Sequence, residues 1–508
     1  MAVEVELKLS TDPASLARVR EHPALAAVLR GGARTSKDVS TYYDTRSQEL
    51  RKAGIALRVR RSGQRWMQTV KGAGDRLGAV SRRPEYEWPL RSSRIDAGRL
   101  STTPWRSVFE ATAGRLHPVF VTDFDRTAQE LTFSDGTRAT LSLDTGEIRC
   151  GRKRVSLTEI EIELVDGEPR LLHELALALA KDLPVSVSQA SKSERGYALT
   201  RPALRKPVRA QKLSLARGAS VADALVPFGS DCLTQIGANA PGVAAGAGDE
   251  FVHQARVGVR RLRSLLTLIE DLMGAAATAP VVEELQWLST PLGAARDWDV
   301  FATDALAAVA RSLRHPQSRR DVGVLRGRVT RERIARHVEA GTAAASPRLQ
   351  RLLLSSSALL ASMQSPTADP RLRAPARGMA REVLEHRARR LAKRGAHLER
   401  LSPAQRHRAR IEAKKLRYVA EIFAPLFPAA RTKAYLASLG RLQGALGHLN
   451  DLATGERLLD ELAPRARTER LVHGAGIVRG WLSGAEAPAL ADCARARRKF
   501  ARLKPFWR

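Results

Sequence analysis

The sequence has few cysteines and no long apolar run. Its three cysteines, Cys150, Cys232 and Cys493, are scattered through 508 residues without metal-ligand or disulfide spacing. This argues against a disulfide framework and a thiolate metal centre. No segment approaches the roughly 18 consecutive apolar residues that a membrane-spanning helix needs. Acids stand near the N-terminus where a signal peptide would place basic residues, so we expect a cytoplasmic protein without membrane association.

Acidic residues are too few to balance the basic ones. The chain has 85 Lys and Arg against 53 Asp and Glu, a net charge of +32. Residues 1–200 contain 32 basic and 26 acidic side chains, so the excess lies mainly in the later residues. Such a polycation requires a polyanionic partner. Specific nucleic-acid binding is not expected, because no nucleic-acid module and no interleaved stacking aromatics appear.

Alternation of charged and apolar residues predicts strands. In residues 2–9, Glu4, Glu6 and Lys8 alternate with valine and leucine. Similar alternation occurs at 38–44, 54–61, 64–71, 83–90, 119–133, 137–144 and 155–165. Together with apolar-periodic segments at about 13–30 and 169–182, which we expect to be helices, these segments predict an antiparallel barrel or sandwich.

The charged residues keep one parity within each predicted strand. Arg58 and Arg60 share one face, and so do Glu159, Glu161 and Glu163. In an ordinary sheet these side chains would face water, whereas in a closed barrel they would face a polar lumen. Because like charges repel unless counter-charges or metal ions lie between them, the clusters favour the lumen.

The composition changes after residue 200. Residues 201–212 are basic and interrupted by proline, which predicts a linker. Beyond them the chain is rich in Ala, Leu and Arg without strand-like segments, so we expect only helices. We therefore divide the chain into a barrel domain (1–202), a linker (203–214) and a helical domain (215–508) with repeats at about 215–364 and 377–508.

The helical part contains an internal duplication. The segment from His253 to Arg263 aligns with that from His407 to Arg417 at an offset of 154 residues, and a second motif keeps the same offset. At 100° per residue, the basic side chains of each copy fall within roughly 80° on one side of a helix. A solvated basic face is one interpretation. Two such faces packed about a pseudo-two-fold axis would instead form a groove for an extended polyanion.

These patterns resemble two known families. The later half is similar to the CHAD family, whose hallmark is a pair of H-x-x-R-[VI]-x-x-[RK]-[RK]-L-R segments. The first 200 residues resemble the CYTH family of triphosphate tunnel metalloenzymes. The residues that carry this resemblance are Glu4-x-Glu6-x-Lys8, Tyr42-Tyr43-Asp44-Thr45, Leu57-Arg58-Val59-Arg60, Lys71, Arg83-x-Glu85-x-Glu87, Arg126, Leu143-Asp144-x-Gly146, Glu159-x-Glu161-x-Glu163 and Ser191-Lys192-Ser193.

The resemblance implies an eight-stranded antiparallel β-tunnel with flanking helices, followed by an all-α domain of two duplicated helical bundles. It also implies a lumen with basic residues for triphosphate and carboxylates for Mg²⁺ or Mn²⁺. We therefore expect metal-dependent hydrolysis of inorganic triphosphate to pyrophosphate and phosphate. The CHAD resemblance implies binding of long-chain polyphosphate by the helical domain, and leaves association with polyphosphate granules open.

Site residues are assigned on the same basis. The expected catalytic residues are Glu4, Glu6, Lys8, Glu161 and Glu163, and the expected metal ligands are Glu4, Glu6, Asp144, Glu161 and Glu163. The expected substrate-binding residues are Lys8, Arg58, Arg60, Lys71, Arg83, Glu85, Arg126 and Lys192. The expected polyphosphate-binding residues are His253, Arg256, Arg260, Arg261, Arg263, His407, Arg410, Lys414, Lys415 and Arg417. The gap after Lys71 leaves open whether Arg82 or Arg83 faces the lumen.

Three other functions remain open from the sequence. A non-catalytic polyphosphate-binding protein would need no carboxylates, and the nearly complete acid set argues against it. A thiamine triphosphatase or an adenylate cyclase would need an aromatic or apolar pocket for the base-bearing part of its substrate, which the sequence does not show clearly.

Overall fold

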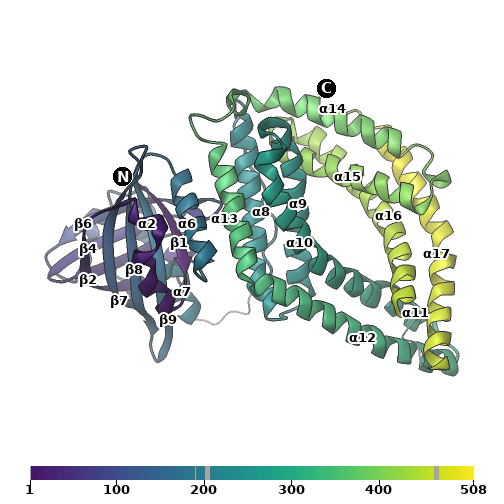
Figure 1. Cartoon of the computed structure of the whole chain (residues 1–508), viewed down its shortest axis with the longest axis horizontal. Coiled ribbons are helices and arrows are strands. Elements are labelled where there is room, and N and C mark those ends of the chain that lie inside the picture. Colours follow the sequence, from purple (N-terminus) through teal and green to yellow (C-terminus); the bar gives the residue numbers. More distant parts are fainter. Residues whose placement is uncertain (1, 189, 201–205, 463–467) are drawn as a thin grey trace. The chain divides into compact units, whose positions relative to one another are not determined.

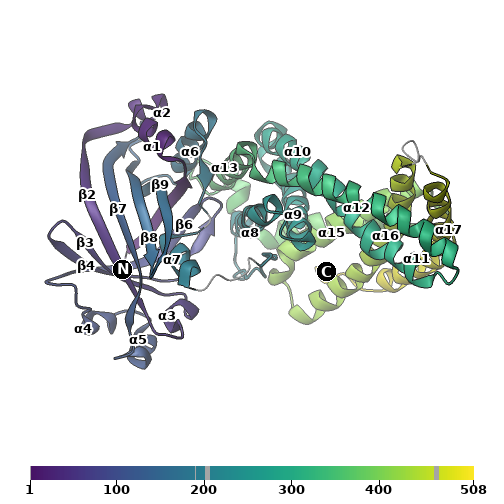
Figure 2. The same cartoon turned by 90° about the horizontal axis from the view of Figure 1, so that it is seen from below.

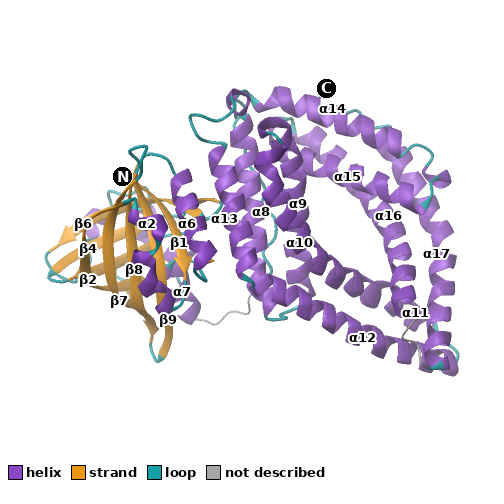
Figure 3. Ribbon diagram, in the orientation of Figure 1, coloured by secondary structure: helices purple, strands orange, loops and turns teal. Residues whose placement is uncertain are grey.

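A computed structural model describes residues 2–188, 190–200, 206–462 and 468–508. The chain forms two compact units. The first comprises Met1–Lys206 together with Pro347–Thr367, and the second comprises Pro207–Ser346 together with Ala368–Arg508. The named strands all belong to the first unit, and the described part of the second unit is built from long helices (Figure 3).

The first unit is built on a closed antiparallel barrel (Figure 1). The sheet order is β10-β1-β9-β8-β7-β2-β3-β4-β6-β5, and pairing of β1 with β6 closes eight of the strands into a ring. This confirms the predicted eight-stranded tunnel. The strands are β1 (Ala2–Ser10), β2 (Leu29–Asp44), β3 (Ala56–Ser62), β4 (Arg65–Lys71), β5 (Asp75–Leu77), β6 (Val80–Leu90), β7 (His117–Thr132), β8 (Arg138–Cys150), β9 (Lys153–Asp166) and β10 (Ser186–Val187).

Strand alternation separates the polar lumen from the apolar shell. On β1, Leu7 and Leu9 are fully buried, and helix α6 (Arg170–Asp182) packs against this strand. Glu6 and Lys8 point the other way and line a cavity. Because side chains alternate strictly along a strand, the apolar residues fix which charges point inward.

Short helices lie at both ends of the barrel (Figure 2). They are α1 (Pro13–Arg18), the 3₁₀ turn η1 (Val19–Glu21), α2 (Pro23–Ala26), α3 (Glu49–Lys52), α4 (Ala97–Leu100) and α5 (Arg106–Thr112), while α7 (Lys192–Thr200) follows β10. The prediction of one helix at 13–30 is wrong in its extent. His22 is extended and its ring accepts the backbone N–H of Ala24, so Pro23 begins a new helix. β2 then begins at Leu29.

Helix α13 (Pro347–Ser362) belongs to the barrel unit, although it lies far along the chain. It packs against α6 and against β5 and β10. The reason is an apolar face whose leucines are buried, namely Leu349, Leu352, Leu353, Leu354 and Leu360. The domain boundaries drawn from the sequence stay a prediction, and the structure differs from them at this helix.

The second unit contains two similar helical series. The first is α8 (Val221–Ala244), α9 (Asp249–Met273), α10 (Ala275–Val300), the π-helical turn η2 (Phe301–Ala305), α11 (Leu306–Ser312) and α12 (Pro316–Ala345). The second is η3 (Pro370–Arg373), α14 (Ala376–Arg394), η4 (Leu398–Arg400), α15 (Pro403–Phe423), η5 (Ala424–Leu426), α16 (Ala429–Leu462) and α17 (Glu469–Ala501). The duplicated basic segments lie on α9 and α15, which pack against each other. None of the described helices has the length and apolarity to cross a membrane.

Candidate active site in the barrel and a second basic pocket

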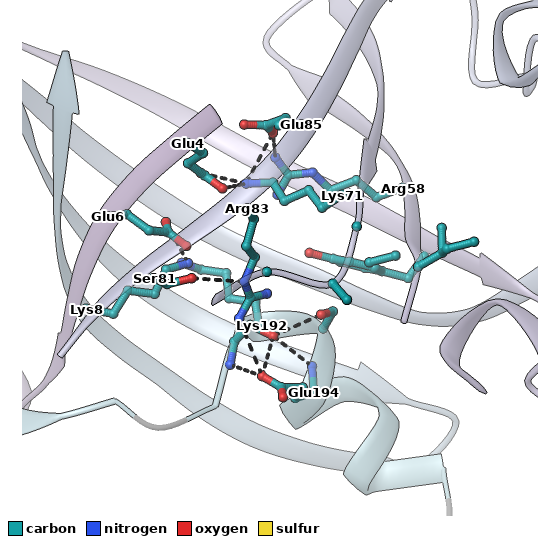
Figure 4. Close-up of a pocket in the computed structure, with 18 of the residues that line it drawn as sticks. Glu4, Glu6, Lys8, Arg58, Lys71, Ser81, Arg83, Glu85, Lys192 and Glu194 are labelled. Carbon is teal, nitrogen blue, oxygen red and sulfur yellow. Dashed lines mark hydrogen bonds and ion pairs between the residues drawn. The ribbon is translucent and has the colours of Figure 1, made fainter. Parts of the chain in front are cut away.

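The lumen holds a cavity of about 560 Å³ lined by nine cationic and seven anionic side chains. Figure 4 shows several of them converging from β1, β3, β4, β6 and α7. All the predicted catalytic and substrate-binding residues line this cavity, namely Glu4, Glu6, Lys8, Arg58, Arg60, Lys71, Arg83, Glu85, Arg126, Glu161, Glu163 and Lys192. Asp144, a predicted metal ligand, is fully buried and contacts two of them.

One charge network is centred on Glu161 of β9. Its carboxylate lies 2.7 Å from Nζ of Lys192, 2.8 Å from Nζ of Lys8 and 2.6 Å from Nη2 of Arg126. Burial would raise the pKa of Glu161, but the charges of Lys192, Lys8 and Arg126 hold it well below its usual range. Glu161 is therefore ionised and holds three cations at the wall of the lumen.

Three carboxylates in this network lie close enough to share a metal ion. Oxygens of Asp144, Glu159 and Glu161 lie within 4.8 Å of one another, and all three side chains are buried. Lys192 contacts all three, and Arg195 donates to Glu159 at 2.6 Å. Asp144 and Glu161 were predicted as metal ligands, whereas Glu159 was not. Its place in the Glu159-x-Glu161-x-Glu163 alternation is the sequence feature that could have identified it.

A second network surrounds Glu4 on the adjoining wall. Nζ of Lys71 lies 2.6 Å from Glu4 and 3.2 Å from Glu85 (Figure 4). Arg58 lies 3.9 Å from Glu85, and both Arg58 and Arg60 lie within 4 Å of Glu87. Lys71 is thus bonded closely to Glu4, whereas Arg58 and Arg60 are held loosely by carboxylates that an anionic ligand could replace.

Glu163 stands where negative charge is poorly compensated. It is the direct cross-strand neighbour of Glu6, an arrangement of like charges that is unfavourable. Desolvation and the charges of Glu4, Glu6 and Glu85 raise the pKa of Glu163 to about 7. Desolvation also raises the pKa of Glu85, with a further contribution from Glu4. Oxygen donors with excess negative charge fit a hard divalent cation such as Mg²⁺ or Mn²⁺.

The structure decides between Arg82 and Arg83. Arg83 lines the cavity, where its Nε donates to Ser81 Oγ at 3.0 Å and its guanidinium lies 3.9 Å from Glu194. Arg76 also lines this part of the cavity, although sequence reasoning did not select it. Arg76 pairs with Ser81 where β5 lies against β6. The β5 segment is too short for alternation in the sequence to reveal that pairing.

Asp44, part of the family-like motif on β2, does not line the cavity. Its carboxylate accepts the backbone N–H groups of Thr45, Leu50 and Arg51 at 2.7–3.0 Å and the hydroxyl of Tyr197 at 2.7 Å. It therefore anchors the turn into α3 and ties α7 to the barrel.

The helical unit has a second pocket of about 570 Å³ between the duplicated segments. It brings together five of the predicted polyphosphate-binding residues, namely His253, Arg256, Arg260, His407 and Arg410, and adds Arg296, Arg406 and Arg457. The basic faces of α9 and α15 therefore share one pocket, as the duplication predicted. Arg263, Lys414, Lys415 and Arg417 do not line it.

The prediction for Arg261 is wrong. Its side chain is buried, lies 2.6 Å from Asp231 and stacks over Phe228 at 4.4 Å. Arg261 follows Arg260 directly, so it projects about 100° away around the helix and faces α8 rather than the pocket. Its charge is satisfied internally, which indicates a structural role.

Cations crowd one another beside this pocket. Burial and the charges of Arg410, Arg260 and Arg256 lower the pKa of Lys414 to about 6. Burial and Arg260 also lower the pKa of Arg256 to about 10. Six arginines from both repeats line the pocket against four carboxylates, and Arg256 lies 3.6 Å from Asp297, so positive charge is partly compensated but in excess, an arrangement that favours an anionic ligand.

Comparison with known proteins matches the two parts of the chain to two families. Residues 2–197 match the CYTH domain family and residues 229–460 match the CHAD domain family. An inorganic triphosphatase from Haemophilus influenzae is 30% identical over 201 residues, which is 39% of this chain and 55% of that protein. The chain thus spans about half the length of this curated relative.

A solved structure is similar to the helical part. The crystal structure of the CHAD domain from the plant Ricinus communis is 33% identical, covers 59% of this chain and 98% of that chain, and gives a TM-score of 0.53. With the two family matches and the two compact units described above, this likeness places the chain plainly: it consists of a CYTH domain followed by a CHAD domain.

Proposed function

We propose that the barrel hydrolyses inorganic triphosphate to pyrophosphate and phosphate with the help of a divalent metal ion. The observation that carries this proposal is the lumen itself, in which cationic side chains and ionised carboxylates face one cavity. Phosphoryl transfer needs positioning and neutralisation of phosphate charge more than it needs covalent chemistry from the protein. The triphosphatase relative supports the same class of reaction.

Cationic side chains on both walls of the lumen would bind the substrate. Lys8, Arg126 and Lys192 on one wall and Arg58, Arg60 and Lys71 on the other would bind phosphate oxygens. Each of these cations already lies near a carboxylate oxygen. Bound triphosphate would exchange those contacts for phosphate contacts of the same type, so its charge would be neutralised by side chains that already line the lumen.

Glu4, Glu6 and Glu163 would hold the metal ion, and the group formed by Asp144, Glu159 and Glu161 offers a second candidate position. When bound, Mg²⁺ or Mn²⁺ would neutralise phosphate charge and lower the pKa of water. As an ionised ligand beside the ion, Glu163 would also orient the attacking water. The neighbouring carboxylates of Glu6 and Glu163 would repel phosphate in a site that only binds it, so this pair favours a metal-dependent enzyme over a non-catalytic binding site.

The lumen offers no stacking surface for a nucleobase or thiamine ring among its described residues. The aromatic residues along it, Tyr42, Phe124 and Tyr197, are 4%, 2% and 3% exposed. Tyr42 stacks on Phe120 with ring centroids 4.5 Å apart, and Lys192 covers the ring of Phe124 at 5.1 Å. These observations favour inorganic triphosphate over thiamine triphosphate or ATP.

The helical unit is proposed to bind long-chain polyphosphate in the pocket between α9 and α15. Guanidinium groups from both repeats line that pocket, and the lowered pKa of Lys414 marks an excess of positive charge beside it. A flexible polyanion that carries one charge on each phosphate could contact both repeats at once.

The reaction is tested by measuring phosphate release from triphosphate, pyrophosphate, ATP and long-chain polyphosphate, each with Mg²⁺, Mn²⁺ or a chelator. We expect phosphate release from triphosphate that depends on the metal and exceeds release from ATP by at least about tenfold. The reason is that the described lumen residues offer no stacking surface for a nucleobase. Pyrophosphate, as a product, should not be hydrolysed. Equal rates with chelator, or faster turnover of ATP, would reject the proposal.

Glu163 gives a prediction about protons. Below about pH 7 its carboxyl group is protonated in the metal-free protein. Binding of Mn²⁺ at about pH 6 should therefore release about one proton, and at about pH 8.5 almost none. Calorimetry in buffers of different ionisation enthalpy measures this release, and Glu163→Gln should remove it. Proton release that does not depend on pH would exclude Glu163 as a ligand.

A further inference from the structure

The lumen extends beyond β4 along a short hairpin. β4 ends at Lys71 and β5 begins at Asp75, yet both strands pair with β6. β5 therefore continues the line of β4 along β6. Lys71 lies opposite Glu85, and Arg76 lies opposite Ser81. Because directly opposed residues share a face of the sheet, Arg76 points into the lumen with Ser81, and both line the cavity.

Arg76 adds a cation to one end of the cavity. It is partly buried near Arg83, Glu194 and Glu6, and desolvation, reinforced by Arg83, lowers its pKa. Ser191 donates to the Glu194 carboxylate from its backbone N at 2.7 Å and from its hydroxyl at 2.8 Å. Glu194 is thus partly engaged by Ser191, and Glu6 lies 3.0 Å from Lys8, while the start of α7 faces the same space. Cations outnumber carboxylates around the cavity as a whole, which favours an anion.

Helix α13 fixes the turn of this hairpin. The backbone N–H of Ala79 donates to Ser357 Oγ at 3.0 Å, and Ser357 is buried. Gly78 has a φ of +62°, and a Cβ at this position would lie 2.6 Å from the Ser357 Cβ. Only glycine therefore allows the turn to approach the helix this closely. At β10, Gln350 Oε1 accepts the backbone N–H of Val187 at 3.0 Å.

We propose that Arg76 is a substrate-binding residue for the phosphoryl group at the β5 end of the lumen, and that α13 positions it by holding the Gly78–Ala79 turn against Ser357. The proposal deepens the proposed triphosphatase function and rests on it. It also gives a segment within the CHAD match, residues 347–362, a role in the barrel.

The role of Arg76 is tested with Arg76→Ala in the full chain. We expect the KM for triphosphate to rise about tenfold with kcat changed less than about threefold, because Arg76 is four residues along β6 from the Glu85 pairing position. Inhibition by pyrophosphate should change little, since a shorter anion need not reach the hairpin. Arg152→Ala, at an exposed turn of the same unit, is the control. An unchanged KM would overturn this role.

The positioning role is tested with Gly78→Ala and Ser357→Ala. Both should raise the KM for triphosphate by several fold, and adding Arg76→Ala to Gly78→Ala should raise it little further, because residues that act as one unit are not additive. Ser355→Ala removes a hydroxyl from the same helix that donates to the backbone carbonyl of Leu352 at 3.2 Å, and should leave KM unchanged. Fully additive effects of Gly78→Ala and Arg76→Ala would overturn the role of α13.

Two measurements keep the possible failures apart. Thermal unfolding identifies a variant that has lost its fold, in which case the milder Ser357→Ala decides the question. Calorimetric binding of triphosphate to the unmodified chain tests the proposed function by itself. If the unmodified chain neither binds nor hydrolyses triphosphate, the proposed function fails. If it binds normally and Arg76→Ala binds equally well, only this inference fails.

Discussion

Replacing Lys8 by methionine should lower kcat for triphosphate by about 10²–10³-fold, the usual effect of removing one preorganised electrostatic contact from a transition state. Lys8 is the cation that joins β1 to β9, since its Nζ lies 3.0 Å from Glu6 and 2.8 Å from Glu161. Glu161 keeps Arg126 and Lys192 as partners in the variant. The loss should therefore appear in turnover more than in the arrangement of the remaining charges of this wall. Steady-state phosphate release with saturating metal measures it.

A loss of stability must be separated from a loss of catalysis in this experiment. Lys8→Met leaves the buried Glu6 without its 3.0 Å partner, and an uncompensated buried charge costs several kcal/mol. In Lys8→Met/Glu6→Gln both charges are removed, so the melting temperature should recover while activity stays low. Glu6→Ala should be inactive as well. Normal turnover in both Lys8→Met and Glu6→Ala would remove β1 from the mechanism.

The barrel could be predicted from the sequence because its constraint is local. Alternation with period 2 on β1 and β9 indicates which residues share a face, and closure of the sheet turns that face into a lumen. Glu4, Glu6, Lys8 and Glu161 are therefore found together as expected. The same logic fails for 13–30, where apolar spacing looks helical although Pro23 breaks the helix and β2 begins at Leu29.

Features that depend on distant partners could not be predicted. Arg261 carries the same charge as its neighbours, and only Asp231 and Phe228 on α8 show that it is structural. The leucines of α13 are equally consistent with packing inside a helical bundle, and nothing local indicates that α6 receives them. Arg76 belongs to a three-residue strand too short for alternation to reveal. In each case tertiary contacts decide the role of the residue.

The largest effect on polyphosphate binding should come from Arg256→Ala/Arg260→Ala/Lys414→Ala/Arg410→Ala. We expect affinity for long-chain polyphosphate to fall at least about 100-fold, and the slope of log affinity against log salt to fall by about 2, because each of the three arginines that line the pocket contributes roughly 0.7 to that slope. These residues come from both repeats, and burial together with their mutual repulsion lowers the pKa of Arg256, Arg410 and Lys414. Titrations at several salt concentrations measure both quantities.

The matched control replaces the same number of basic residues on the same two helices. Arg263, Arg408, Lys415 and Arg417 lie outside the lining of the pocket, so their replacement by alanine should reduce affinity far less. If both quadruple variants lose affinity equally, net charge rather than the pocket determines binding.

Lys414 supplies a signature that simple loss of charge cannot imitate. With a pKa of about 6 it is mostly neutral at pH 7 in the free protein. A polyanion bound beside Arg256, Arg260 and Arg410 would offset their repulsion and raise that pKa, so binding at about pH 7 should take up about one proton. Lys414→Met should abolish the uptake while retaining part of the affinity. Binding without proton uptake in the unmodified chain would place the polyphosphate away from Lys414 and therefore away from the junction of the two repeats.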